Sequence, residues 1–226
     1  MLLLVWLIEM VIIALSMSNH FYKDLAGLYK KAKDLEQANL QARYTALQKQ
    51  LNPHFLFNSL NVLISEIEYN PANAVVFTRN LSDTYRYILL SQDKKLVPLE
   101  EELRFLDTYI NLHRTRLGEC INVQSSLPED VLDERVPPLT LQLLVENVIK
   151  HNIISMGRPM TITLGTERQE EQDWLIISNP IRPKQGVTGT GKGLENLSVR
   201  YHLLCHKDVE IHKTGDSFTV KVPLIP

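Results

Sequence analysis

Apolar residues recur with the period of an α-helix through the first half of the chain. Between residues 21 and 52 there is no proline and one glycine, Gly27, and Ala, Leu, Lys, Gln and Glu predominate, all good helix formers. This pattern predicts either a parallel two-stranded coiled coil or a single amphipathic helix packed on its own chain. Leucine and alanine form two adjoining lines, Leu28, Leu35 and Ala42, and Leu25, Ala32 and Ala46.

The segment before this helix, residues 2–17, is apolar apart from Glu9 and Ser16. It is slightly shorter than the roughly 20 residues that cross a bilayer. No basic residue precedes it and no small-residue cleavage pattern follows, which argues against a signal peptide. Because lysines follow it closely, and positive residues favour the cytoplasmic side, we expect the last membrane helix of a longer receptor. The alternative is an ordinary buried or oligomeric helix.

Helical periodicity continues to residue 118, interrupted by prolines. Pro53 lies inside an amphipathic pattern over residues 47–69, where it would bend or restart the helix. A second helix is predicted after the Asn-Pro pair at residues 70–71. A third begins near Pro98, has acidic residues in its first turn, and ends before Gly118.

The pattern changes after Gly118 to short alternating strands mixed with helices. Strands are predicted over 121–127, 160–167, 173–178, 208–213 and 217–225, and helices over 136–153 and 194–206. The polar turn between the second and third strands predicts a β-hairpin. The whole chain is therefore expected to be α+β and multidomain, with helices followed by a sandwich whose antiparallel sheet is covered on one face.

Composition narrows the function only slightly. The 226 residues are 44% hydrophobic and 22% charged, with a formal net charge of −2, which gives no general attraction to nucleic acid. Cys120 and Cys205 lie far apart without metal-ligand spacing, which indicates a reducing compartment.

The first candidate for chemistry is His54, directly after Pro53. On a helix, the polar residues near it share one face, and an apolar stripe suited to a bundle core lies beside that face. An imidazole with a reference pKa near 6.5 is mostly an uncharged nucleophile at neutral pH. The alternative is a structural histidine in a kinked helix. The polar face contains Gln50, His54, Asn58, Asn61 and Ser65, and the apolar stripe Leu56, Leu60, Leu63 and Ile67.

A second candidate is the sequence LVENVIKHN. Asn147, Lys150 and His151 follow the i, i+3, i+4 spacing that places side chains on one helix face, and Glu146 flanks them. An amide oxygen is a hard ligand that suits Mg²⁺, and the two basic residues suit phosphate oxygens. The alternative is a solvated helix edge with a Glu146–Lys150 pair.

A third candidate is the glycine-rich sequence GVTGTGKGLENL, which opens directly into a predicted helix. Its glycines allow backbone amides to approach phosphate. It lacks the Gly-Lys-Ser/Thr ending of a P-loop and follows a hairpin, so neither a P-loop nor a Rossmann site is expected.

Taken in order, these three segments resemble a LytS-type sensor histidine kinase. LNPHFLFNSLN is similar to the phosphoacceptor motif of that family, LQLLVENVIKHN to its N-box, and GTGKGLENLSVRY to its G-box. The resemblance runs from about residue 45 to the C-terminus. It implies a dimerisation and phosphoacceptor domain followed by a GHKL-type (Bergerat) ATP-binding domain.

The resemblance also implies an activity. His54 would receive the γ-phosphoryl group of ATP and pass it to an aspartate of a separate response regulator, which in this family often carries a LytTR DNA-binding domain. Asn58 is a candidate for orienting water during dephosphorylation of that regulator. Asn147 would hold Mg²⁺, with Glu146, Lys150 and His151 near the phosphates. The glycine-rich segment would close over the triphosphate through Gly189, Thr190, Gly191, Gly193 and Leu194.

Two positions depart from the family pattern. Phe55 follows the histidine where many histidine kinases have an acidic base, so the base is unassigned and Glu146 is one candidate. Asn179 stands where these domains usually have the aspartate that binds the adenine amino group, followed by Pro180 and Ile181. Loss of that charge predicts nucleotide binding weaker by roughly tenfold. The competing hypothesis is a catalytically weak or inactive dimeric signalling module of the same fold.

The resulting prediction is a homodimeric, autophosphorylating protein of the bacterial cytoplasmic (inner) membrane, in which residues after about 20 lie in the cytoplasm. Four regions are expected: a transmembrane remnant over 1–20, a coiled-coil linker over 21–46, a dimerisation and phosphoacceptor domain over 47–118, and a catalytic domain over 119–226.

Overall fold

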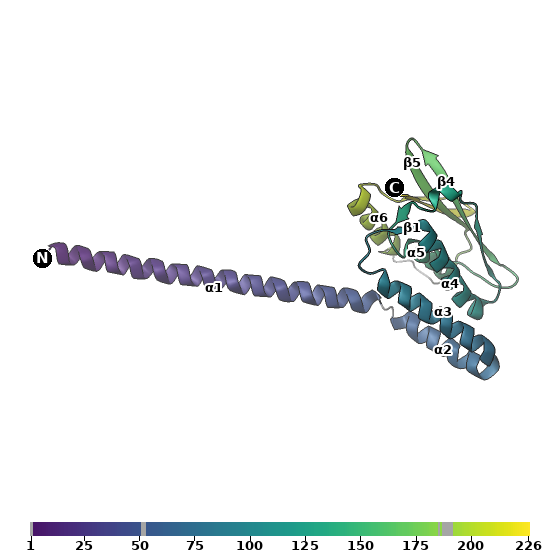
Figure 1. The fold of residues 1–226 in the computed structure, drawn as a ribbon, viewed down its shortest axis with the longest axis horizontal. Coiled ribbons are helices and arrows are strands. Elements are labelled where there is room, and N and C mark those ends of the chain that lie inside the picture. Colours follow the sequence, from purple (N-terminus) through teal and green to yellow (C-terminus); the bar gives the residue numbers. More distant parts are fainter. Residues whose placement is uncertain (1, 51–52, 185, 187–191) are drawn as a thin grey trace. The chain divides into compact units, whose positions relative to one another are not determined.

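The computed structural model of the chain describes residues 2–50, 53–184, 186 and 192–226, which form two compact units, Met1–Leu56 and Phe57–Pro226. The first unit is dominated by α1 (Leu2–Gln50), one helix of 49 residues that passes through the predicted boundary at residue 20 (Figure 1). Leu28 and Leu35, on the predicted heptad line, are 65% and 71% exposed. In the described part of the chain no helix combines the length and apolarity needed to cross a membrane, so the membrane helix predicted for 1–20 is not confirmed.

The helix that follows α1 begins where the sequence predicted a restart. α2 (Pro53–Tyr69) has Pro53 as its first residue, a position where the missing N–H of proline costs no helical hydrogen bond. Leu60 and Ile67 on its apolar stripe are 41% and 56% exposed, so the chain itself does not bury that stripe.

The next two helices have the ends that their sequences predict. The Asn70 side chain accepts a 3.2 Å hydrogen bond from the Asn73 N–H and caps α3 (Pro71–Leu90). α4 (Leu99–Leu117) begins after Pro98 and ends at Gly118, whose φ of 68° lies in the left-handed region that glycine tolerates. The rings of Tyr87 on α3 and Phe105 on α4 stack with centroids 4.2 Å apart, which packs the two helices together.

Among the described residues one five-stranded sheet forms, in the order β2-β4-β5-β7-β6. Its predicted central hairpin is confirmed, since β4 and β5 are antiparallel, and β7 pairs antiparallel with both β5 and β6. The expectation of a purely antiparallel sheet is wrong, because β2 lies parallel to β4. A helix, α5, lies between these two strands in the sequence, and such a crossover allows parallel pairing. The strands are β2 (Ile121–Ser125), β4 (Met160–Gln169), β5 (Gln172–Pro180), β6 (Glu210–Lys213) and β7 (Ser217–Pro223).

One face of this sheet forms the core of the second unit. In β4, Met160, Ile162 and Leu164 are fully buried, whereas Thr163 between them is exposed. The helices α5 (Thr140–His151) and α6 (Lys192–Cys205) bury Leu141, Val145, Leu197 and Tyr201, and lie on one side of the sheet with α4 (Figure 1). The predicted α+β class with one covered sheet face is therefore confirmed.

A small two-stranded sheet joins α4 to the chain that enters α5. β1 (Val97–Pro98) pairs antiparallel with β3 (Arg135–Val136), and a short 3-10 helix (Glu129–Val131) precedes β3. This pairing brings the first turn of α4 close to the start of α5.

Candidate functional site

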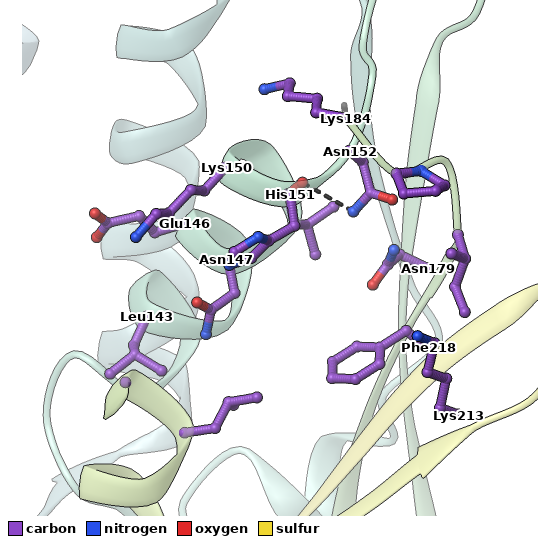
Figure 2. A pocket seen from close by; sticks show the side chains of 15 residues that line it. Leu143, Glu146, Asn147, Lys150, His151, Asn152, Asn179, Lys184, Lys213 and Phe218 are labelled. Atoms are coloured by element: carbon purple, nitrogen blue, oxygen red, sulfur yellow. Dashed lines mark hydrogen bonds between the residues drawn. The ribbon is translucent and has the colours of Figure 1, made fainter. Parts of the chain in front are cut away.

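A cavity of about 520 Å³ lies between α5, the end of β5 and the first turn of α6. Its size is within the range of small-molecule and cofactor sites. Figure 2 shows side chains of α5 on one side and Asn179 and Phe218 on the other. The cavity is lined by Leu143, Glu146, Asn147, Val148, Lys150, His151, Asn152, Asn179, Ile181, Pro183, Lys184, Gly193, Leu194, Lys213 and Phe218.

The predicted cluster on α5 faces this cavity. Asn147, Lys150 and His151 all line it, as their helical spacing predicted, because the apolar residues Leu141, Leu144 and Val145 anchor the opposite side of the helix in the core. The Asn147 Nδ2 atom is buried and has no hydrogen-bond partner in the described part of the chain. A buried amide without a partner is costly, so this side chain is suited to a bound group.

Charged groups on α5 have shifted pKa values. Burial raises the pKa of Glu146, and the charge of Lys150 opposes that shift. Burial, followed by the charges of Lys150 and Lys184, lowers the pKa of His151 below its ordinary 6.5. Lys213 also lines the cavity. With three lysines and one glutamate, the wall suits an anionic ligand.

Asn152 fixes the end of α5 to the segment that leads into the glycine-rich stretch. Its Nδ2 donates to the Val148 carbonyl at 3.0 Å, and its Oδ1 accepts the Arg182 N–H at 2.7 Å. The Lys184 Nζ donates to the Ile149 carbonyl at 2.7 Å, near the C-terminus of α5, where a cation is favourable. These bonds hold a lysine at the rim of the cavity.

The opposite wall comes from the sheet. Asn179 lies near the end of β5, is 4% exposed, and pairs in register with Phe218 of β7. Its Nδ2 donates to the Pro180 carbonyl at 2.8 Å. That bond uses one of the two amide hydrogens. The amide oxygen could accept a hydrogen bond from a ligand, and the Phe218 ring supplies an apolar surface in the same wall.

The third wall is the start of α6. A Cβ atom added at Gly193 would lie 3.8 Å from both amide atoms of Asn147. Glycine at this position therefore keeps open the space in front of that side chain. Leu194 also lines the cavity. The predicted residues Gly189, Thr190 and Gly191 lie outside the described residues.

Two predicted residues, His54 and Asn58, belong to α2. His54 is the second residue of α2, and its side chain lies outside the described part of the structure. Asn58, one turn later, is half-buried and does not line the cavity.

Sequence reasoning missed several lining residues: Asn152, Lys184, Lys213 and Phe218. For Phe218 the alternating pattern predicted a strand but gave no sign of a cavity. Lys184 lies in a stretch without periodicity. Asn152 follows His151 directly, but its position in the sequence does not predict its hydrogen bond with the Arg182 N–H.

Comparisons with known proteins bear on the predicted resemblance. Residues 42–121 match a family model described as Histidine kinase. The chain is 27% identical over 197 residues to Sensor protein LytS of Staphylococcus haemolyticus, a match to 79% of this chain and 34% of that protein. It is 26% identical over 198 residues to Sensor histidine kinase BtsS of Escherichia coli, a match to 86% of this chain and 35% of that protein.

One solved structure is also similar, the catalytic domain of histidine kinase ThkA. It is 18% identical, with a TM-score of 0.40, and the match covers 58% of this chain and 97% of that one. The chain spans about a third of the length of the curated relatives that it matches. The family model and the relatives confirm the predicted resemblance and support the class of enzyme that it implies.

Proposed function

We propose that this chain, which resembles LytS-type sensor histidine kinases over most of its length, transfers the γ-phosphoryl group of ATP to its own His54. The observation that carries the proposal is the cavity itself. Three separate chain segments, α5, the end of β5 and the start of α6, bring the predicted Asn147, Lys150, His151, Asn179 and Gly193 to one site, and β7 adds Phe218. These residues were predicted from segments that are separate in the sequence, between positions 147 and 193. Their meeting at one cavity supports a common site.

The residues present fit a magnesium ion and a nucleotide. Asn147 would hold Mg²⁺ through its amide oxygen, and the ion would neutralise charge on the phosphates. Lys150, Lys184 and His151 would meet phosphate oxygens. Phe218 and Asn179 would bind the base, the ring by apolar contact and the amide as a neutral acceptor. The predicted glycine loop would complete the phosphate site.

In the proposed reaction a ring nitrogen of neutral His54 attacks the γ-phosphorus. The bond between that phosphorus and the β–γ bridging oxygen breaks, ADP leaves with the electron pair, and the ring proton passes to a base or to water. Glu146 is the candidate base within the cavity wall, since burial raises its pKa above the ordinary value of a glutamate. Phosphoryl transfer depends mainly on alignment and charge neutralisation, which this wall is built to supply.

The partners follow from the same resemblance. We propose a response-regulator aspartate as the acceptor of the phosphoryl group, with Asn58 orienting water when the regulator is dephosphorylated, and a second copy of this chain as the dimer partner. The exposed apolar stripe of α2 supports dimerisation. The apolar segment 2–17 supports attachment to a membrane, although no described helix meets the requirements of a span.

The direct experiment is labelling with γ-³²P-ATP and Mg²⁺. The expected product is an acid-labile, base-stable phosphoprotein that disappears in His54→Gln. His20→Gln is the matched control, because His20 is an exposed histidine on α1 and should label normally. A label that survives His54→Gln, or no label at saturating ATP, would contradict the proposal.

One observation favours a second candidate, a dimeric signalling module with little or no catalysis. Asn179 has lost the charge expected at the base-binding position, and Pro180 follows it. Such a module would bind Mg-ADP weakly and show no phosphohistidine. The labelling experiment separates the two, because the module predicts ADP binding without any label on His54.

A further inference from the structure

A buried carboxylate lies outside the proposed nucleotide site. Glu102, in the first turn of α4, is fully buried. It accepts three hydrogen bonds, from the Tyr87 hydroxyl at 2.8 Å, the Leu139 N–H at 2.7 Å and the Leu141 N–H at 3.0 Å. Burial raises the pKa of Glu102, while these donors and the charge of Arg200 lower it. A buried carboxylate that accepts hydrogen bonds from three donors is held in one position. Exposed acidic residues on the surface of a helix are not held in this way.

The donors on Leu139 and Leu141 belong to the start of α5. That helix has no acidic residue in its first turn and no side-chain cap of its own, and Leu139 adopts a left-handed φ of 65°. A non-glycine residue in this region is strained. Glu102 therefore replaces the missing cap, since a carboxylate at a helix N-terminus satisfies free N–H groups and complements the helix dipole.

The same turn is also tied to α6. The Arg200 Nη1 donates to the Pro138 carbonyl at 2.7 Å. Burial lowers the pKa of Arg200, and the charge of Glu102 raises it, so the two groups stabilise each other across the turn. α6 carries Gly193 and Leu194 in the cavity wall, and α5 carries Asn147. Both helices of the cavity are thus anchored to one turn.

The third donor connects this turn to α3. Tyr87 lies in the last turn of that helix, and its ring stacks on Phe105 while its hydroxyl reaches Glu102. α3 follows α2 directly, the helix that carries His54, and Asn73 on α3 donates to Glu66 on α2 at 2.6 Å. Tyr87 therefore links the last turn of α3, through Glu102, to the first amides of the nucleotide-site helix.

We propose that Glu102 is a positioning residue, which through Tyr87 couples occupancy of the α5–α6 cavity to the order of α3. The proposal rests on the proposed function for the identity of the ligand. In this arrangement a ligand that fixes α5 also fixes Glu102, and Glu102 fixes the end of α3. Tyr87→Phe cuts the link to α3 but leaves both backbone donors on Glu102. Glu102→Gln, in contrast, removes the negative charge and turns an amide N–H group toward groups that themselves donate hydrogen bonds.

The test uses the full chain with Mg-ADP as the ligand and hydrogen exchange of residues 71–90 as the readout. In the unsubstituted chain, saturating Mg-ADP is expected to slow exchange in α3 by about threefold or more. Tyr87→Phe should abolish that slowing while the Kd for Mg-ADP changes by less than about twofold, since the α5 cap is intact. Glu102→Gln should weaken Mg-ADP binding by about tenfold, the scale of one hydrogen bond to a charged group.

A kinetic readout is independent of exchange. Tyr87→Phe should lower the rate of His54 labelling by about tenfold with the KM for ATP unchanged, whereas a generally destabilised fold would shift both. Tyr69→Phe and Glu101→Gln are matched controls, since Tyr69 is 84% exposed and Glu101 pairs with Lys94 at the surface. Both should resemble the unsubstituted chain.

The outcomes separate the two proposals. Ligand-dependent protection of α3 that persists in Tyr87→Phe would overturn the coupling. A rise in the KM for ATP as large as the fall in labelling rate would overturn it as well. An unlabelled chain whose α3 protection still depends on Tyr87 would reject the kinase function and support the coupling. A chain that binds no nucleotide would reject both.

Discussion

Asn179 is the residue proposed to bind the adenine base through its amide oxygen. Its amide nitrogen is already held by the Pro180 carbonyl, and the side chain is almost fully buried beside Phe218. A carboxylate here would accept a stronger hydrogen bond but would be buried without a cation when the cavity holds no ligand. Under the proposed function, we therefore expect the asparagine to lower ligand affinity and to raise the stability of the free protein.

Asn179→Asp should tighten Mg-ADP binding by about tenfold, because a charged acceptor binds an amino group more strongly than a neutral one. The same change should lower the Tm of the nucleotide-free chain, since it buries a charge. Fluorescence titration with a mant-labelled ADP and thermal unfolding measure the two effects. Asn122→Asp, at an exposed position of β2, is the control and should change neither. Unchanged affinity in Asn179→Asp would contradict the proposed role.

His151 gives the site a pH dependence with a definite sign. Its pKa is below 6.5 in the free chain because of burial and the charges of Lys150 and Lys184, so it is neutral at pH 7. Bound phosphate would raise that pKa, so binding takes up a proton and tightens as the pH falls through the interval between the two values. In the nucleotide-free chain the lowered pKa has the opposite effect: stability present above pH 6.5 is lost as the pH falls through the folded pKa.

His151→Gln should remove the proton uptake that accompanies Mg-ADP binding near pH 6. Calorimetric titrations in buffers of different ionisation enthalpy measure that uptake directly. His212→Gln is the matched control, because His212 is an exposed histidine of β6 beside Glu210 and should leave the uptake intact. Equal uptake in His151→Gln and the unsubstituted chain would place the phosphates away from His151.

At the scale of elements, local sequence signals set the start or end of α2, α3 and α4. Asn70 and Gly118 cap α3 and α4 from within the sequence, and Pro53 starts α2. α5 depends instead on Glu102, thirty-seven residues before Leu139. The helix that carries the proposed metal ligand is therefore the one whose start is controlled from elsewhere in the fold.

Pro53→Ala tests the restart of the helix at His54. Alanine restores a backbone donor and removes the clash with the preceding turn, so the change favours one continuous helix across residues 50–53. We expect the rate of His54 labelling to change by about tenfold while Mg-ADP affinity stays within about twofold, as nucleotide binding does not use this helix. Pro71→Ala, at the equivalent first position of α3, is the control. Equal effects on labelling and binding would count against a role of Pro53 in positioning His54.

At the scale of the whole molecule, apolar side chains remain exposed on both compact units. α1 exposes Leu28 and Leu35, and α2 exposes Leu60 and Ile67 along one stripe. Isolated apolar residues at a surface are normal, but a stripe at helical spacing is typical of an interface. A second copy of the chain is the proposed partner that covers it.

The double substitution Leu60→Lys with Ile67→Lys should weaken self-association by at least about a hundredfold, because each dimer would lose four buried apolar side chains. Sedimentation velocity over a dilution series measures the dissociation constant. Ser65→Lys adds one positive charge, half that of the double substitution, on the polar side of α2 and should leave the association unchanged. If both variants associate as the unsubstituted chain does, this stripe is not the dimer interface.

The amino-acid sequence by itself determined what depends on neighbours within a few residues. The ends of α3 and α4, the β4–β5 hairpin and the covered sheet face follow from caps, turns and periodicity. The grouping of Asn147, Lys150 and His151 also follows, because a helix with 3.6 residues per turn fixes it whatever the surroundings.

Only the tertiary structure decided which distant residues meet. Sequence pattern assigned Glu102 to the acidic first turn of α4, but packing of α3, α4 and α5 buried it as the cap of another helix. Phe218 and Lys184 likewise entered the cavity through strand register and a connecting segment. The parallel pairing of β2 with β4 was also missed. Such contacts depend on how elements pack in space, and local propensity and periodicity carry no information about that packing.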